Sequence, residues 1–145
     1  MQPYLLAPAQ GSDQADEWQR LGLEAQTTGN FPLAQQRYQQ ALRLDPRHAL
    51  ATQNLAIVFA QSNLINEALL TIERAELLDG VHGMIKMNFA LLAMEAERLD
   101  LALEKAHQAH EQEPTTYTRM ALAMALTSAG RPAEAIPLYN EILDA

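Results

Sequence analysis

The chain has 145 residues, with 18 acidic and 10 basic side chains and a formal net charge of -8. This balance disfavours nucleic acid and anionic membrane as partners, because both require clustered lysine and arginine. The lack of cysteine excludes disulfides and thiolate chemistry. No stretch approaches the roughly 18 to 20 apolar residues that a membrane-spanning helix needs.

Residues 1–13 are expected to form a flexible or extended leader. The apolar run from Tyr4 to Ala7 lies between Pro3 and Pro8, is too short for a signal peptide and has no basic segment before it. The leader therefore favours a cytoplasmic location. Ser12 or Asp13 comes next as a candidate N-cap for the first helix.

The remaining chain predicts an all-α fold of eight helices in consecutive pairs. The expected ranges are 14–28 with 31–44, 48–62 with 65–78, 83–97 with 99–112, and 115–129 with 132–144. The joint from Asp79 to Gly83 holds two glycines and no proline, so any hinge is expected there. Pro137 lies inside the last helix, where it removes one N–H donor and should bend the first turns slightly.

Residues of one kind recur at fixed steps along these pairs. Leu21 returns as Leu55, Phe89 and Leu122, at steps of 34, 34 and 33 residues. A column of small residues is expected at close helix contacts, where a larger side chain would overpack: Ala34, Ala68, Ala102 and Ala135. A turn column holds Gly29, Asn63, Glu97 and Gly130. Positive φ is easiest for glycine and tolerable for asparagine, so the turn at Glu97 is expected to depart from the pattern.

This pattern resembles the tetratricopeptide (TPR) repeat, a helix–turn–helix unit of about 34 residues. The first unit carries it most fully, in Trp18, Leu21, Gly22, Gly29, Phe31, Ala34, Tyr38, Ala41 and Pro46. The resemblance implies an α-solenoid of about four such units, wound as a right-handed superhelix. The TPR domain would then span 14–145, with units at 15–48, 49–82, 83–115 and 116–145. It also implies that the first helix of each unit lines a concave groove.

The sequence ends at Ala145, directly after the last predicted helix, without the polar capping helix that usually closes a repeat array. Some of the last apolar face is therefore expected to stay open, at Ile136, Leu138, Tyr139, Ile142 and Leu143. Two explanations compete. The chain is a fragment of a longer protein, or it forms a homo-oligomer through this uncapped end.

Motifs of catalysis are missing from the sequence. There is no cysteine nucleophile, no G-x-S-x-G, no S-x-x-K, and no glycine-rich nucleotide loop. His107 and His110, near Glu104 and Glu111, are interpreted as a solvated helix face, because no second cluster completes a metal shell. We therefore expect no metal site, no cofactor and no enzymatic activity.

The groove that the resemblance implies is the candidate site. Helical spacing places nine side chains on its inner face: Gln53, Asn54, Ile57, Met84, Met87, Asn88, Leu91, Met120 and Met124. Methionines suit adaptable binding surfaces, although packing between neighbouring helices is the competing interpretation. Asn54 and Asn88 share one slot, which resembles the asparagine ladder of O-GlcNAc transferase TPRs. Local bridging between helices is the alternative for these amides.

The leading hypothesis is a non-catalytic module that binds an extended peptide or partner helix in its groove. The asparagines would hold backbone groups, and the methionines would accept apolar side chains. A clamp for a C-terminal carboxylate is rejected, because Gln19, Met84 and Asn88 stand where cations would be needed. Two alternatives remain: the N-terminal arm of a larger enzyme, such as a glycosyltransferase, and a self-assembling scaffold.

Overall fold

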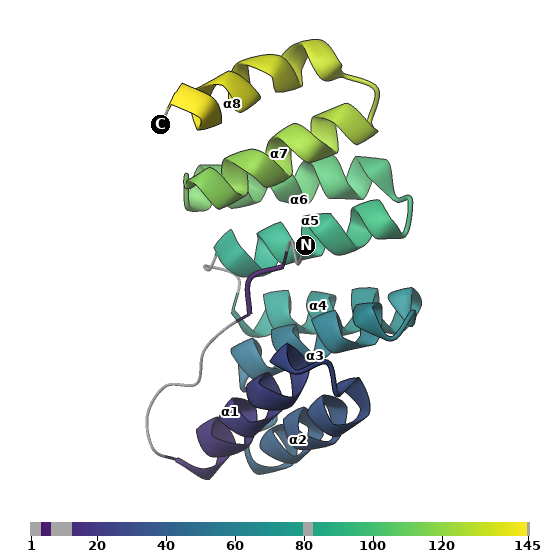
Figure 1. Ribbon diagram of the computed structural model, residues 1–145, viewed down its shortest axis with the longest axis vertical. Coiled ribbons are helices and arrows are strands. Elements are labelled where there is room, and N and C mark those ends of the chain that lie inside the picture. Colours follow the sequence, from purple (N-terminus) through teal and green to yellow (C-terminus); the bar gives the residue numbers. More distant parts are fainter. Residues whose placement is uncertain (1–3, 7–12, 80–82, 145) are drawn as a thin grey trace. The chain divides into compact units, whose positions relative to one another are not determined.

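In the computed structural model, the described residues are 4–6, 13–79 and 83–144. They form eight α-helices and no strand, so the predicted all-α class is confirmed (Figure 1): α1 Gln14–Thr27, α2 Phe31–Leu44, α3 Ala49–Gln61, α4 Ile65–Leu78, α5 Gly83–Glu95, α6 Leu99–Gln112, α7 Thr116–Ser128 and α8 Pro132–Asp144. The second helix of every pair has the predicted bounds, whereas each first helix ends one or two residues sooner. None of these helices is both long and apolar enough to cross a bilayer.

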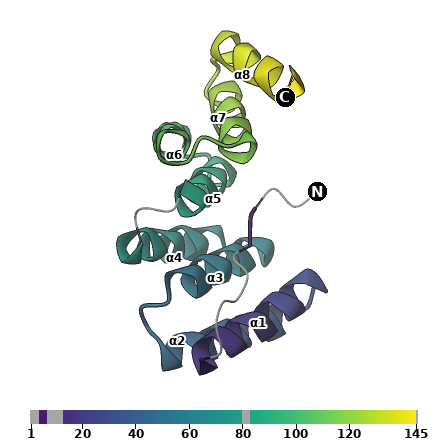
Figure 2. The same ribbon diagram turned by 90° about the vertical axis from the view of Figure 1, so that its left-hand side faces the viewer.

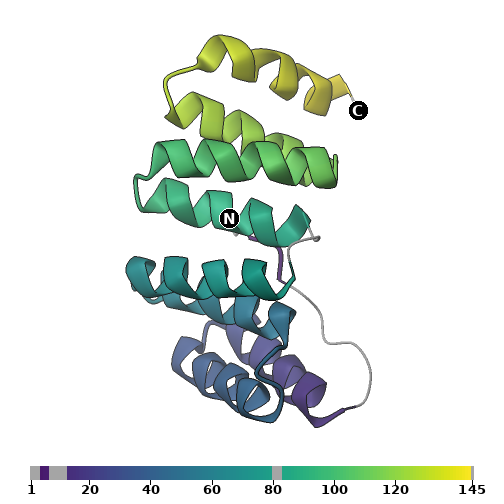
Figure 3. The ribbon, with the colours of Figure 1, turned by 180° about the vertical axis from the view of Figure 1, so that it is seen from behind.

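The chain divides into two compact units. We call them the N-terminal half, Tyr4–Asp79 with α1–α4, and the C-terminal half, which begins at Gly80 and contains α5–α8. The expected hinge from Asp79 to Gly83 falls at this boundary, and its residues 80–82 lie outside the described part of the chain. Within each half, helices that follow one another in sequence run antiparallel and pack against each other (Figures 1 and 3).

The N-terminal half is closely packed where Gly22 on α1 faces Tyr38 on α2. A Cβ atom built on Gly22 would lie 2.6 Å from Cε1 of Tyr38, so no side chain fits there. The Tyr38 ring fills this space and is fully buried. It belongs to a core cluster that joins α1, α2 and α3 (Figure 2): Ala25, Ala34, Tyr38, Leu55 and Val58. The small residue predicted at Ala34 therefore lies at a close helix contact.

The core of the C-terminal half involves all four of its helices. Its buried members are Ala90, Ala106, Leu122, Ala123, Ala125, Leu126 and Ala135. Leu138 and Tyr139 of α8 pack against this cluster, but Ala135 is the buried residue of that helix, and Ile136 and Leu143 are exposed. Helix α8 runs through Pro137 without interruption.

The turns between paired helices all share one conformation. Gly29, Asn63, Glu97 and Gly130 have φ values of 84°, 63°, 59° and 76°. The expectation that Glu97 would break this pattern is therefore wrong. The reason is the backbone: Arg98 N–H donates to Ala93 O at 2.8 Å, as Asn30 N–H does to Ala25 O at 2.9 Å. These bonds satisfy carbonyls at the helix ends, and they hold glutamate in a region that it adopts at a cost.

Candidate peptide-binding surface

A chain of polar side chains, four of them buried and Gln61 half-buried, joins three helices of the N-terminal half. Gln53 Nε2 donates to Asn54 Oδ1 at 3.3 Å, and Asn54 in turn is hydrogen-bonded to the hydroxyl of Tyr38. The Tyr38 hydroxyl donates to Gln26 Oε1 at 2.7 Å, and Gln26 Nε2 donates to Gln61 Oε1 at 2.7 Å. We call these five side chains, from helices α1, α2 and α3, the amide relay. Because each amide is fixed by its neighbours, the relay holds the Gln53 amide in one orientation.

Burial keeps the phenol of this relay neutral. Desolvation raises the pKa of Tyr38 well above its ordinary range, although the hydrogen bond from Asn54 acts in the opposite direction. A neutral phenol can donate one hydrogen bond and accept another, and Tyr38 does both here. The relay is therefore a polar network inside an apolar cluster, with its donors running from Gln53 toward Gln61.

The end of the relay at Gln53 contacts the leader. Gln53 Nε2 donates to the backbone carbonyl of Leu5 at 3.4 Å. Tyr4 is only 6% exposed, and Leu5 and Leu6 are half-buried, without helical structure. The described part of the leader thus lies against α3, in contact with a side chain that was predicted to bind peptide. A backbone carbonyl carries no sequence information, so this contact does not depend on the side chain of Leu5.

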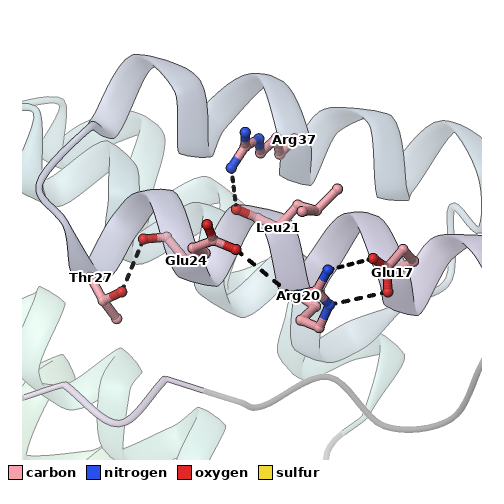
Figure 4. A network of polar contacts seen from close by, with 6 residues as sticks. All are labelled: Glu17, Arg20, Leu21, Glu24, Thr27 and Arg37. Atoms are coloured by element: carbon pink, nitrogen blue, oxygen red, sulfur yellow. Dashed lines mark hydrogen bonds and ion pairs between the residues drawn. The ribbon is translucent and has the colours of Figure 1, made fainter.

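Polar contacts outside the relay hold α1 and α2 together. Arg37 of α2 donates from Nη1 to the Leu21 carbonyl of α1 at 2.8 Å (Figure 4). Nearby on the surface, Arg20 binds both oxygens of Glu17, at 2.5 and 3.1 Å. The hydrogen bond from Arg20 lowers the pKa of the exposed Glu17 carboxyl. Solvent screens that pair, so the contact of Arg37 with the backbone matters more for the position of α1.

His48 links the first two repeats. Its Nδ1 accepts from the Ala51 N–H at 3.1 Å, which caps α3, and its Nε2 lies 2.6 Å from Asp16 Oδ1 on α1. Since Nδ1 accepts, Nε2 carries the proton that is donated to Asp16. The loop position of His48 therefore has a structural role, and this contact joins the start of α3 to α1.

The C-terminal half distributes its predicted site residues over different environments. Asn88, Met87 and Leu91 on α5 are buried. Met84 on α5 and Met124 on α7 are half-buried, whereas Met120 on α7 is 37% exposed. Helices α5 and α7 are in contact with each other. Met87 therefore packs in the interior, as the competing interpretation held, while Met120 is the methionine most open to a partner.

The histidine pair on α6 has separate environments. His107 is exposed, whereas His110 Nδ1 lies 3.1 Å from Thr118 Oγ1 at the start of α7. Thr118 also forms a capping box with Thr115. Across residues 4–6, 13–79 and 83–144, no three His, Cys, Asp or Glu side chains gather as a metal would require. His110 is thus a contact between the third and fourth repeats.

Sequence reasoning identified Gln53 and Asn54, which the structure brings together, but it missed their partners. Gln26 lies one position away from the inner-face pattern, and Tyr38 was interpreted only as part of the repeat motif. The contact between Gln53 and Leu5 joins residues 48 positions apart. The number of amides gives no signal, because α1 and α3 carry three each and α2 carries four glutamines.

Stacked antiparallel helix pairs with small residues at their contacts and left-handed turns define a helical-hairpin repeat protein. The particular class is the tetratricopeptide repeat family, to which this chain belongs: the model of that family matches residues 20–80 and 87–145. The predicted resemblance to TPR proteins is therefore confirmed. A search of curated proteins gives no match.

Solved structures support the same fold. A crystal structure of MamA is 18% identical, with a TM-score of 0.74, and the match covers 93% of this chain and 75% of that one. MamA 41-end from Desulfovibrio magneticus RS-1 is 16% identical, with a TM-score of 0.78 and coverage of 91% and 75%. The Sgt2 TPR domain from Aspergillus fumigatus is 17% identical, with a TM-score of 0.78 and coverage of 90% and 87%. At these identities, the likeness shows the TPR fold alone.

Proposed function

We propose that the chain is a non-catalytic interaction module that binds a peptide segment of a partner protein along the first helices of its repeats. The observation that carries the proposal is the hydrogen bond from Gln53 Nε2 to the carbonyl of Leu5. It supports a site on α3 that accepts a non-helical stretch of chain through its backbone. The TPR family membership of the chain agrees with a role in protein interaction.

Within this proposal, the side chains have different tasks. Gln53 binds the backbone of the partner, and Asn54 orients Gln53 through the relay. In the C-terminal half, Met120 and the half-buried Met84 and Met124 accept apolar side chains, because thioethers adapt to varied shapes. Asn88, Ile57, Met87 and Leu91, all buried, shape the surface from beneath.

The test begins with a peptide library that is panned against the full chain. Gln53→Met keeps the length of the side chain but removes both donors. A buried carbonyl without its donor costs about 1–3 kcal/mol, so binding of peptides that use α3 should weaken about tenfold or more. Affinity is measured by fluorescence anisotropy, and thermal melting checks that the fold is intact. The matched control is Gln36→Met, because Gln36 is an exposed glutamine of α2.

Substitutions at Met120 and Met124 are expected to change which peptides are selected. A different result would contradict the proposal: every selected peptide binds the Gln53→Met, Met120→Ala double variant as tightly as the wild type, and Gln36→Met or His107→Ala weakens peptide binding. The proposal is then wrong, and the binding surface lies on the second helices.

Self-association is the alternative that one observation favours. Ile136 and Leu143 of α8 are 56% and 80% exposed, and a second copy of the chain would shield them from water. Sedimentation of the wild type and of Leu143→Ser over a range of concentrations tests this: a species that stays monomeric at every concentration excludes the homo-oligomer. No observation singles out the enzyme-arm alternative.

A further inference from the structure

We propose that residues Tyr4–Leu6 act as a built-in pseudo-ligand, which occupies the peptide site on α3 and competes with the partner for it. This inference rests on the proposed function and deepens it. The segment is covalently joined to α1 through residues 7–12, yet it contacts α3 as an added peptide would. The leader would thereby regulate the site, and its sequence indicates the kind of peptide that the site binds.

Helix α3 is buried along most of its length. Eight consecutive residues, Ala51 to Val58, are buried, which is more than two helical turns. A run of that length presents side chains in every direction around the helix, so α3 is covered on all sides. Helices α1 and α2 each bury residues on one face, whereas α5 of the C-terminal half is buried all round like α3. Part of the cover of α3 is the leader, whose Leu5 carbonyl lies 3.4 Å from Gln53 Nε2.

The contact between Gln53 and Leu5 uses a group that is common to all peptides. A glutamine amide has two N–H donors, and Gln53 directs Nε2 at Asn54 Oδ1 and at the Leu5 carbonyl. The first bond belongs to the relay, and the second is made to a group that every peptide possesses. Any segment that places a carbonyl at this point can therefore replace the leader, without a change in the helices themselves.

The composition of α3 and of the leader indicates the kind of partner. Helix α3 contains no charged residue, although the chain carries a net charge of -8. The segment whose carbonyl Gln53 binds is Tyr4-Leu5-Leu6, of which the tyrosine is the most deeply buried. Burial of an unpaired charge against such a surface would be unfavourable. The partner is therefore inferred to be a protein segment that is non-helical and uncharged, with an aromatic residue followed by aliphatic ones.

Competition follows from the covalent connection. Six residues join Leu6 to Asp13, the N-cap of α1, so the leader is held near α3 at a high effective concentration. A partner binds only the fraction of molecules in which the leader has left, and its apparent affinity falls in proportion. Weakening the leader should therefore tighten the binding of a free peptide.

The experiment uses the full chain and a labelled synthetic peptide with the sequence of residues 2–9, Gln-Pro-Tyr-Leu-Leu-Ala-Pro-Ala. Tyr4→Ser removes the buried aromatic ring of the leader. We expect the peptide to bind this variant about tenfold more tightly than the wild type. Gln53→Met introduced into Tyr4→Ser should remove the gain. Leu77→Ser, an apolar-to-serine change on the exposed side of α4, should leave the affinity at the wild-type value.

The outcomes separate the two proposals. Equal affinity of the peptide for the wild type and for Tyr4→Ser overturns the pseudo-ligand, and so does a peptide that binds neither. If panned peptides depend on Gln53 but ignore Tyr4→Ser, the proposed function stands and the competition fails. If the leader peptide binds Tyr4→Ser but no unrelated peptide can be selected, the contact is confirmed and the proposed function fails.

A last measurement decides whether the site is occupied by the leader of the same chain or by the leader of a second copy. A wild-type dimer that forms with increasing concentration, and that Tyr4→Ser abolishes, would place the leader on a second copy of the chain. That result would overturn the intramolecular pseudo-ligand. Sedimentation velocity of both proteins gives this answer, and the expected result is the same mass for the two.

Discussion

The N-terminal and C-terminal halves share one backbone plan but differ in the chemistry of their first helices. In the N-terminal half, Gln26 of the first repeat donates to Gln61 of the second at 2.7 Å. The corresponding residues of the C-terminal half are Met94 and Ser128, which meet in an O–H···S contact at 3.8 Å. The residue that corresponds to Tyr38 in the third repeat is Ala106. The same contact between repeats is thus made by two amides in one half and by a thioether and a hydroxyl in the other.

This difference shows that a shared repeat position does not ensure a shared role. Asn54 and Asn88 occupy one slot and are both buried, but Asn54 is bonded to Tyr38, whereas the residue one repeat after Tyr38 is Ile72, which has no hydroxyl. The amide relay therefore belongs to the N-terminal half. We infer that the first half binds backbone and that the second half contributes adaptable apolar contacts.

The largest expected effect comes from removing the aromatic ring at the centre of the relay. Tyr38→Ala leaves a cavity opposite Gly22, and truncations of this kind cost about 3–5 kcal/mol. The cavity lies in the N-terminal half, and the C-terminal half already has Ala106 at the corresponding position. Hydrogen-exchange protection should therefore be lost in α1–α4 only. Chemical denaturation followed by the fluorescence of Trp18 on α1 measures the loss. Tyr117→Ala, at a 60% exposed position, should change stability by less than about 0.5 kcal/mol.

A smaller effect separates the hydroxyl from the ring. Tyr38→Phe leaves relay partners unpaired, at a cost of about 1–3 kcal/mol near neutral pH. Because burial raises the pKa of Tyr38, the unfolded chain ionises first. The stability that the hydroxyl provides is fully present below about pH 10 and falls by about 1.4 kcal/mol per pH unit above it.

The difference in unfolding free energy between wild type and Tyr38→Phe should therefore be constant below about pH 10 and shrink at higher pH. The other tyrosines are common to both proteins, so their contributions cancel. A difference that stays constant to pH 11.5, by urea denaturation, would mean that the phenol is not held neutral by the fold.

The smallest effect compares the turns of the two halves. Glu97→Gly should stabilise the C-terminal half by about 1 kcal/mol, because glycine adopts positive φ without the crowding of a Cβ atom. Asn63→Gly should stabilise the N-terminal half by only about a few tenths of a kcal/mol, since asparagine tolerates positive φ. Thermal melting measures both shifts. Equal shifts would show that side-chain crowding at Glu97 is relieved by its surroundings.

Helices and turns could be predicted well because their causes are local. Apolar spacing, Pro32 and Pro132 near helix starts, and the turn column act within a few residues of one another. The error at Glu97 has the opposite cause, since hydrogen bonds of the flanking helices impose a conformation that glutamate does not favour. The amides at Gln53 and Asn54 were found through helical spacing. Their connection to Tyr38 and Leu5 was not, because it depends on which helices and leader residues meet in the folded chain.

The direction of the hydrogen bonds in the amide relay determines which backbone group of a segment on α3 can bind to Gln53. Each donor points onward from Gln53 to Gln61, so at the contact with Leu5 Gln53 presents its Nε2–H, which binds an acceptor there. To receive an N–H group instead, every amide along the relay would have to rotate, and the Tyr38 hydroxyl would have to turn with them. A segment that shifts by half a peptide unit places its N–H where its carbonyl was. Binding in that position would cost the free energy of rotating all of these groups together. Under the proposed function, the buried polar groups would thus fix where the backbone carbonyl of a bound chain lies.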